Sequence, residues 1–281
     1  TTSNVNGIRA AKRKGIEQWA AKNTPDVWCM QEVRAPQNEI DPIFDEFGFE
    51  YATAGRIADQ SGLDRMNEIC RIKGRAGVGL LSALPVIDKR YGLPGLAEDV
   101  DSGRWIEADV KTPQGYTVTV VCVYVHAGNT DDPEKMKQKY RFLDTMLVRM
   151  GQLRDEAAHG GRQAVLCGDF NIAHTPLDIK NAKANEKHAG FLPEERAYVD
   201  KWLGELEFVD VMRSLCGDIQ GPYTWWSQRG RAFDNNVGWR IDYQFATPEL
   251  AETARGFVID KAPTYDLRWS DHAPLSITYD V

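Results

Sequence analysis

Acidic side chains in this sequence tend to lie where apolar, strand-like segments end. VWCM runs into Gln-Glu, AVLCG runs into GDFN, one Asp lies within WRIDYQF, and Ser-Asp-His precedes APLSITY. Acids at the ends of buried strands are costly unless they converge on a metal ion or on each other. Strand ends suit catalytic groups because the sheet holds them rigidly while the loops give access. The residues concerned are Glu32, Asp169, Asp242, Asp271 and His272.

Each of these residues also has an ordinary structural explanation. Glu32 could be a surface acid, and Asp169 could belong to a turn, because Gly, Asp and Asn favour turns. Asp242 could form an ion pair with Arg240 beside it, and Asp271 could cap a loop next to a core histidine. The remaining polar candidates could be turn formers or core packing. These explanations hold singly, but they account poorly for the joint occurrence of the residues. The remaining candidates are Asn4, Asn6 and Tyr124.

Apolar, β-branched segments predict strands, and longer amphipathic segments predict helices. Hairpin-like and helix-linked strands both occur, which favours two packed sheets covered by helices over a purely parallel sheet. A full first strand would need residues before Thr1, so we expect the sequence to begin inside that strand. The expected strands are 27–30, 77–81, 118–125, 164–167, 241–246 and 274–279. The expected helices are 9–21, 133–154 and 193–204.

The composition is that of one globular domain. The chain has 281 residues, 42% of them hydrophobic, which is enough for a single large core over residues 1–281. No apolar run approaches the roughly 20 residues that span a membrane, and no signal peptide is visible at the start. The five cysteines are widely spaced, with no disulfide framework or zinc spacing. We therefore expect a cytoplasmic protein, with Cys29, Cys122 and Cys167 as buried thiols.

The net charge of −7 by itself argues against a nucleic-acid partner, because phosphate binding needs positive charge. A divalent ion held by clustered carboxylates reverses the local charge, however. Basic residues are also dense near the start of the chain and within 58–75. Each basic run could equally be a solvated face. The runs are Arg9, Lys12, Arg13 and Lys14, and then Arg65, Arg71, Lys73 and Arg75.

At the level of motifs, the chain resembles the exonuclease III and AP endonuclease branch of the endonuclease/exonuclease/phosphatase superfamily. The motifs SNVNGIRA, PDVWCMQE, GVGLLS, VYVHAGN, LCGDFNIAHTPLDIKN, AGFLPEER, YTWW, VGWRIDY and SDHAP follow one another along the whole chain. The resemblance implies an α/β fold, a four-layer α/β/β/α sandwich with two central mixed β-sheets. It further implies hydrolysis of DNA 5′ to abasic sites, with 3′→5′ exonuclease and 3′-phosphatase activity. The implied partner is duplex DNA with abasic sites or 3′ ends; we expect no membrane partner and a monomer.

The resemblance also implies roles for individual residues. Glu32 matches the principal metal carboxylate, with Asn4 and Asp271 as neighbours. This oxygen-rich set suits Mg²⁺, and Mn²⁺ could substitute. Asp169 matches the group that orients and deprotonates the attacking water. The resemblance places four other residues around the water, the phosphate and the leaving group. They are Asn171, His272, Asp242, which fixes the tautomer of that histidine, and Tyr124.

The expected DNA contacts form a second group. Arg9 and Lys14 match a phosphate-binding stretch, and Asn185 and His188 match loop residues that contact the backbone. Trp225, Trp239 and Ile241 match the walls of a pocket for an extruded abasic sugar, whereas Trp226 suits core packing. In a regular strand Trp239 and Ile241 would face away from Asp242. The pocket and the catalytic site can therefore coincide only if the chain bends there.

Two departures from the family pattern stand out. His126 and Ala127 lie where relatives often carry a proline and a polar amide. Residues 58–75 look longer than the matching loop in compact relatives, and we expect an exposed, mobile segment near DNA phosphates, or else a solvated insertion with no role. The rival functions are a same-fold phosphatase for inositol phosphates or lipids and a DNA-binding protein without catalysis. YTWW with GWRIDY disfavours the former, and the full acidic set disfavours the latter.

Overall fold

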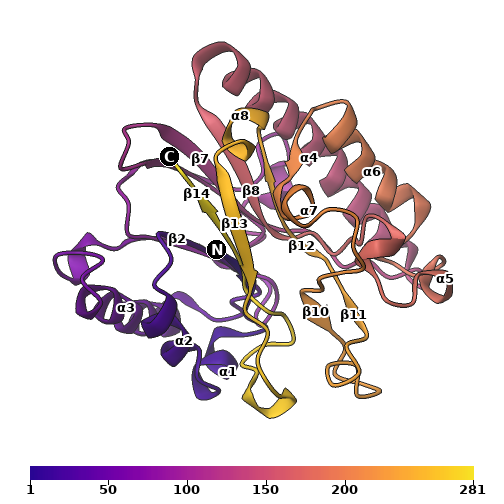
Figure 1. Cartoon of the computed structure of the whole chain (residues 1–281), viewed down its shortest axis with the longest axis horizontal. Coiled ribbons are helices and arrows are strands. Elements are labelled where there is room, and N and C mark those ends of the chain that lie inside the picture. Colours follow the sequence, from indigo (N-terminus) through magenta and orange to yellow (C-terminus); the bar gives the residue numbers. More distant parts are fainter.

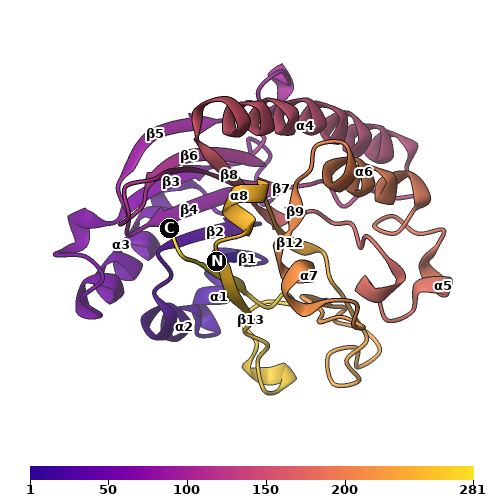
Figure 2. The same ribbon diagram turned by 45° about the horizontal axis from the view of Figure 1, so that its top comes forward.

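Two six-stranded mixed sheets lie face to face at the centre of the protein, with helices on both outer faces (Figures 1 and 2). The computed structural model describes residues 1–281. This arrangement confirms the predicted four-layer α/β/β/α sandwich. One sheet has the order β13-β14-β1-β2-β4-β3, and the other has the order β5-β6-β7-β8-β12-β9. The first sheet contains β1 (Thr2–Asn4), β2 (Val27–Gln31), β3 (Asp64–Glu68), β4 (Val78–Ser82), β13 (Ala254–Ile259) and β14 (Leu275–Tyr279). The second sheet contains β5 (Val86–Tyr91), β6 (Trp105–Lys111), β7 (Thr117–Tyr124), β8 (Gln163–Asp169), β9 (Val209–Asp210) and β12 (Asp242–Ala246).

Each sheet has one parallel strand pair near its middle, β1 with β2 and β7 with β8. Parallel neighbours need a crossover connection, which places helices on the outer face. The first crossover carries α1 (Ile8–Arg13) and α2 (Ile16–Asn23), and the second carries α4 (Pro133–Gly160). Both parallel pairs therefore present the carboxyl ends of their strands to the same rim of the sandwich. A short hairpin of β10 (Trp225–Trp226) and β11 (Gly238–Trp239) projects beside the sheets (Figure 1).

Three apolar layers hold the sandwich together. Residues of both sheets interdigitate between them, the first sheet packs outward on α2 and α3 (Gln37–Thr53), and the second packs outward on α4 and α6 (Pro193–Gly204). Figure 2 shows α4 lying along the outside of the second sheet. The remaining α-helices, α5 (Ala182–Asn185), α7 (Val211–Cys216) and α8 (Pro248–Ala251), are short, as are the 3₁₀ turns Gln60–Gly62, Ala97–Asp99, Pro176–Asp178 and Tyr265–Leu267.

Helix α4 shows how local sequence sets an element. Asp132 caps its start by accepting a hydrogen bond from the Lys135 amide, and Pro133 occupies the first turn. Gly161 ends the helix in the left-handed conformation at φ 82°. The buried side chains recur every three or four residues along one face, as an amphipathic helix requires. That face includes Met136, Phe142, Leu143, Met146, Met150 and Leu153.

The six predicted strands and the helix at 193–204 are confirmed, with boundary shifts of a few residues. The helix predicted at 133–154 continues to Gly160. The helix predicted at 9–21 is wrong as one element, because Gly15 at φ 98° separates α1 from α2. The prediction overlooked α3 and five strands of the sheets, β3, β5, β6, β9 and β13. β3 and β5 carry charged residues at positions open to solvent, β6 alternates apolar residues with the buried acids Glu107 and Asp109, and β9 has only two residues. No uniformly apolar run therefore marks these strands.

Residues 58–75 are more ordered than an exposed loop. Asp64–Glu68 forms the edge strand β3 against β4, with Met66 and Glu68 buried. Arg65 forms an ion pair with Asp45 of α3, which ties it to the outer helical layer. The prediction of a mobile basic segment is therefore wrong for this stretch, because alternate residues of β3 pack inward. Residues 71–75 remain exposed, and their contact with DNA stays a prediction.

The sequence predicted no disulfide framework, three buried cysteines and no membrane-spanning segment. All five cysteines are free, and Cys29, Cys122 and Cys167 are buried, as predicted. None of the helices combines the length and the apolar character needed to traverse a bilayer. His126, which departs from the family pattern, packs edge-on against Phe142, with ring centroids 5.6 Å apart. Burial, together with the charges of Arg104 and Lys139, lowers the pKa of His126 to about 3, so this imidazole is neutral at physiological pH.

Candidate active site

The strand ends that the sequence singled out meet at one rim of the sandwich. Asp169 ends β8 and lies in register with Asp242, the first residue of β12. Tyr124, the last residue of β7, lies in register with Asp169 on its other side. Asn4 ends β1 in the facing sheet and contacts Asp169 directly through its side chain. Residues far apart in the chain thus converge because neighbouring strands of both sheets end together.

His272 lies between the two aspartates of the second sheet. Its Nδ1 is 2.8 Å from Asp242 Oδ2, and its Nε2 is 3.8 Å from Asp169 Oδ2. Burial would lower the pKa of His272, but the charge of Asp242 and then those of Asp169 and Asp271 outweigh it and raise the pKa to about 9. The ring is therefore protonated at neutral pH, and Asp242 orients it. A protonated imidazole donates hydrogen bonds. The ligand atoms of Asp169, Asp242 and His272 also lie within 4.8 Å of one another, close enough to hold a metal ion together.

Asp169 is fully buried and is held by several donors. Its Oδ2 accepts from Asn4 Nδ2 at 2.8 Å and from Asn171 Nδ2 at 3.2 Å, and its Oδ1 accepts from the Asn171 amide at 2.9 Å. Burial raises the pKa of Asp169 to about 7; the His272 charge works against this shift and the Asp242 charge adds to it. Asn171 takes a left-handed φ of 50° to reach back to the carboxylate, which asparagine tolerates. The carboxylate is thus fixed in place and sits near its titration point.

Glu32 faces Asp169 from the other sheet. Asn4 Nδ2 bridges the two carboxylates, donating to Glu32 Oε1 at 2.9 Å, while Asn4 Oδ1 accepts from the Asn6 amide. The second Glu32 oxygen, Oε2, is buried and has no hydrogen-bond partner. It faces the guanidinium of Arg34, which forms an ion pair with it. Two carboxylates bridged by one amide supply the hard oxygen donors that a divalent ion such as Mg²⁺ prefers. Asn4 turns its nitrogen toward the two carboxylates and bridges them, and its predicted place beside a metal ion stays a prediction.

Asp271 and Tyr124 flank this centre. Asp271 accepts hydrogen bonds from Asn6 Nδ2 at 2.7 Å and from the Trp225 indole at 3.1 Å. Burial would raise its pKa, but the His272 charge and these donors hold the pKa below its usual value. Burial and the nearby Asp169 charge raise the pKa of Tyr124 to about 12, so its phenol keeps its proton. The Arg104 guanidinium lies 4.9 Å from the centre of the Tyr124 ring.

Trp225, Trp239 and Ile241 belong to one apolar cluster beside Asp271 and His272. The two indole rings meet edge to face with centroids 5.9 Å apart, and the Trp225 ring centroid is 6.4 Å from that of His272. The conflict expected from strand alternation does not arise, because β11 ends at Trp239 and β12 begins at Asp242. The two residues between them lie outside regular strand, so the chain bends there. Trp226 packs into a different cluster with Phe233, as predicted for a core residue.

Arg240 anchors this bend. It pairs with Asp178 at 2.6 Å and with Asp210 at 2.7 Å, and all three side chains are buried. Burial would raise the pKa of Asp178, but Arg240 and Arg213 outweigh it and lower the pKa to about 2. The alternative of an ion pair between Arg240 and Asp242 is therefore wrong. The acid nearest in sequence points toward His272, while the guanidinium points away to acids from two other segments.

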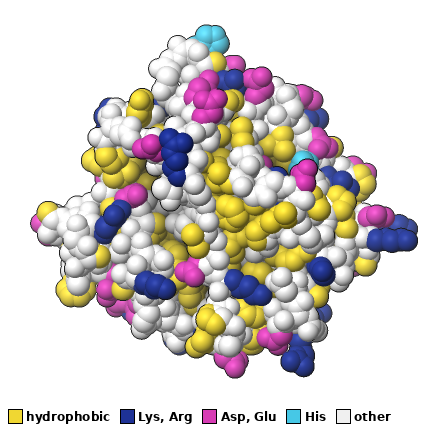
Figure 3. All heavy atoms as spheres, viewed as in Figure 1, with side chains coloured by type: hydrophobic (Ala, Val, Ile, Leu, Met, Phe, Trp, Pro, Cys, Tyr) yellow, Lys and Arg dark blue, Asp and Glu magenta, His cyan; other side chains and the backbone are white.

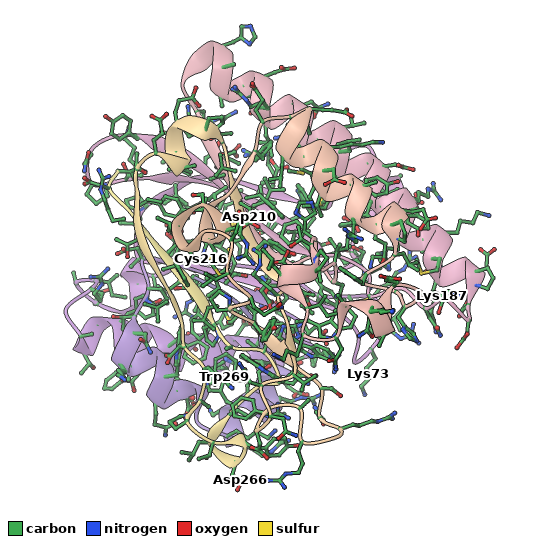
Figure 4. All side chains as sticks on the ribbon, turned by 45° about the vertical axis from the view of Figure 1, so that its right-hand side comes forward. Lys73, Lys187, Asp210, Cys216, Asp266 and Trp269 are labelled. Atoms are coloured by element: carbon green, nitrogen blue, oxygen red, sulfur yellow. The ribbon has the colours of Figure 1, made fainter.

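The polar side chains predicted to contact DNA come from α1, the turn after it and the α5 region. Arg9 pairs with Glu39 at 2.9 Å, and Lys14 and His188 are exposed. The Asn185 side chain donates to the Asn181 carbonyl at 2.8 Å. On the face shown in Figure 3, lysines and arginines lie singly among acidic and neutral atoms. Figure 4 places Lys187, after α5, and Lys73, in the β3–β4 loop, at the periphery of the protein. Their contact with DNA stays a prediction.

Comparison with known proteins agrees with this geometry. The model of the Endonuclease/Exonuclease/phosphatase family matches residues 1–272. This chain belongs to that family. It is 29% identical to an exodeoxyribonuclease of Bacillus subtilis over 99% of this chain and 98% of the relative. It is 30% identical to a DNA-(apurinic or apyrimidinic site) endonuclease of Dictyostelium discoideum, over 99% of this chain and 69% of the relative.

Solved structures of family members have the same fold. An AP endonuclease from Archaeoglobus fulgidus superimposes with a TM-score of 0.81 at 30% identity, covering 100% of this chain and 98% of that one. A 3′ phosphatase from Neisseria bound to a product DNA hairpin superimposes with a TM-score of 0.78 at 27% identity, covering 100% and 98% of the two chains. The resemblance to the exonuclease III and AP endonuclease branch of the family is thereby confirmed.

One buried ion pair behind the site was not predicted from the sequence. Lys139 of α4 and Glu195 of α6 lie 2.5 Å apart, and neither side chain is exposed. Lys139 Nζ also donates to the carbonyls of Ala127 and Asn171, at 3.2 and 2.9 Å. Glu195 Oε2 accepts from the amides of two residues in the 188–192 loop at 2.6 and 3.0 Å. Those two residues are Gly190 and Leu192.

This pair therefore ties together three loops that border the catalytic carboxylates. Burial lowers the pKa of Lys139, with the charges of Glu195 and Asp169 opposing that shift. The only hint in the sequence is that a lysine falls on the apolar face of α4, between Met136 and Phe142. Such a residue could equally have been a snorkelling surface lysine.

We predict that Lys139→Met lowers the free energy of unfolding by about 3–5 kcal/mol, because it leaves the Glu195 charge buried without its partner. Urea unfolding at pH 7 measures the change. The double variant Lys139→Met with Glu195→Gln should recover part of the loss, since no charge then remains buried. Equal free energies of unfolding for the wild type and the single variant would show that the pair does not stabilise the fold.

Proposed function

We propose that this protein is a Mg²⁺-dependent DNA repair phosphodiesterase that hydrolyses the backbone 5′ to abasic sites. We propose further that it trims 3′ ends as a 3′→5′ exonuclease and 3′-phosphatase on duplex DNA, acting as a monomer in the cytoplasm. The observation that carries the proposal is the convergence of Glu32, Asp169 and the Asp242–His272 pair beside the Trp225–Trp239 cluster. The names of the relatives, exodeoxyribonuclease and AP endonuclease, support the same activity.

The carboxylate chemistry supports attack by water on a phosphodiester. Asp169, with its pKa raised to about 7, accepts the proton of the attacking water near neutral pH, where a general base works best. Asn171 and Asn4 keep this carboxylate from rotating. A Mg²⁺ or Mn²⁺ ion held by Glu32 would offset the charge of the phosphate and stabilise the leaving oxygen.

The cationic and phenolic groups act on the phosphate itself. His272, kept protonated and oriented by Asp242, donates from Nε2 to a non-bridging oxygen, where negative charge grows in the transition state. Tyr124 keeps its proton and can donate to the phosphate or to the leaving group. Arg9, Lys14, Asn185 and His188 would position the backbone without reading sequence.

The apolar cluster supports selectivity for a missing base. An abasic site presents no base edge, so hydrogen-bond readout cannot identify it. What differs is size and the small amount of stacking lost when the sugar is extruded. Trp225, Trp239 and Ile241 would form a pocket that admits the bare sugar and excludes an intact nucleotide.

We expect turnover of a duplex containing one abasic analogue in Mg²⁺ and none in excess EDTA. Glu32→Gln should lower kcat by about 10²-fold or more, the scale of a lost transition-state charge interaction, while circular dichroism shows an unchanged fold. A fluorescent-strand cleavage assay measures this, with recessed 3′ ends, 3′-phosphates and inositol phosphates as parallel substrates. Turnover of inositol phosphates without DNA cleavage would favour the same-fold phosphatase.

Asp169→Asn and His272→Asn should each lower kcat by at least ~10²-fold, the usual scale for positioned proton transfer or charge stabilisation. DNA binding, measured by fluorescence anisotropy in Ca²⁺ or EDTA, should largely survive in both. Leu267→Ser is the control, because it changes an exposed apolar residue to which no role is assigned. A loss of affinity in proportion to the loss of rate would make both residues binding groups.

Trp239→Ala should reduce discrimination between abasic and intact duplexes, because it enlarges the pocket. The measured quantity is the ratio of kcat/KM for incision at the abasic analogue to that at an internal intact nucleotide. Trp239→Phe keeps an aromatic wall and should retain most of the ratio. If Trp239→Ala slows both substrates by the same factor, the indole serves packing and not selection.

A further inference from the structure

Arg34 lies two residues after Glu32, in the turn that follows β2. Its guanidinium forms an ion pair with the Glu32 carboxylate. The turn is held by main-chain hydrogen bonds from Val33 to Gly77 and from Arg34 to Ala76, both 2.9 Å. Glu32 and Arg34 both adopt left-handed backbone conformations, at φ 54° and 53°. Such conformations cost energy in residues other than glycine, so the surrounding contacts must impose this geometry.

The two oxygens of Glu32 have different partners. Oε1 accepts from Asn4 at 2.9 Å, whereas Oε2 accepts no hydrogen bond and is the atom that faces Arg34. No other cation of the chain pairs with Glu32, and Arg34 pairs with no other acid. The Glu32 side chain is 11% exposed and that of Arg34 is 39% exposed. The carboxylate is therefore largely enclosed, and the guanidinium is the solvent-accessible partner.

Charge explains why a cation is needed here. A single Asn4 amide group bridges Glu32 and Asp169, so two buried carboxylates lie within reach of one nitrogen. Buried like charges are unfavourable unless a positive group compensates them. Arg34 provides that charge on the Glu32 side, while His272 provides it on the Asp169 side.

Arg34 also has a second polar partner close by. It donates to Asn6 Oδ1 at 2.8 Å, and Asn6 in turn donates to Asp271 at 2.7 Å. A guanidinium that leaves Glu32 can therefore keep its contact with Asn6. Movement away from the carboxylate does not require the side chain to become wholly unpaired.

We propose that Arg34 is an exchangeable counter-cation of Glu32. The guanidinium neutralises the carboxylate when no metal is bound, and a divalent ion must displace it from Oε2. Arg34 thus weakens metal binding while relieving repulsion in the metal-free protein. A displaced guanidinium, with its fork of donors, suits a phosphate oxygen pair; this last consequence rests on the proposed function, whereas the exchange itself does not.

The test is isothermal titration of Mn²⁺ alone into the EDTA-stripped and dialysed protein, without DNA. Arg34→Gln should bind Mn²⁺ about threefold to tenfold more tightly than the wild type, the range set by one partly exposed ion pair. Arg34→Lys keeps a competing charge and should fall closer to the wild type. Arg56→Gln is the matched control, because Arg56 is 40% exposed and pairs with one acid, Asp26, away from the site.

Two further measurements make the outcome decisive. Glu32→Gln should abolish the titration, which places the measured ion at Glu32. The rise in Tm on adding Mn²⁺ should be larger for Arg34→Gln than for the wild type, because a tighter ligand stabilises more. Equal or weaker Mn²⁺ binding by Arg34→Gln overturns the proposal, as does unchanged binding by Glu32→Gln. Tighter binding in a protein that fails to cleave abasic DNA would retain this inference and reject the proposed nuclease function.

Discussion

The concentration of negative charge at one rim of the sandwich is the constraint on which the rest of the structure depends. Glu32, Asp169 and Asp242 are buried within reach of one another, where each alone would be costly. The protein offsets this charge with Asn4, which donates to two of the carboxylates, and with His272, which the third holds protonated. The charged groups remain because a hydrolytic site needs them, and the fold supplies the donors that make them tolerable.

Rigidity around this rim comes from buried ion pairs in a second layer. Arg240 joins Asp178 and Asp210 behind the bend between β11 and β12, and Lys139 joins Glu195 behind three loops. Both pairs also bond main-chain groups, so they fix backbone positions as well as charges. A buried pair contributes little net stability, but loss of one partner is severe. Such pairs therefore suit the task of holding loops in a single conformation.

The acidic composition of the chain is compatible with an anionic substrate if binding depends on local groups and not on the net charge. The net charge of the chain is −7, and on the face shown in Figure 3 the lysines and arginines lie singly. Binding would then depend on local groups at the rim and on the metal, because a bound divalent ion is the largest local charge in such a site. Arg34 belongs to this local balance, since it pairs with the enclosed Glu32 carboxylate and is itself partly open to solvent.

The sequence by itself determined the strands that carry the site. The apolar runs that end at Glu32 and Asp169, and the run that contains Asp242, could be recognised because burial on both faces of a central strand requires unbroken hydrophobic segments. Edge strands such as β3 and β5 were not predicted, because their exposed faces carry charges and their sequence pattern resembles that of a loop. The break at Gly15 was also hidden, since the hydrophobic pattern continues across it.

Only the tertiary structure decided which polar groups pair. Arg240 and Asp242 are close in sequence but point to different partners, and Lys139 finds Glu195 from another helix. Asn4 was expected to neighbour the metal, yet its amide nitrogen faces the carboxylates because the Asn6 amide occupies its oxygen. Side-chain pairing depends on distances across the sandwich, which local sequence does not encode. Strand ends can thus be foreseen from hydrophobic patterns, whereas the partners of each charge emerge only when the two sheets meet.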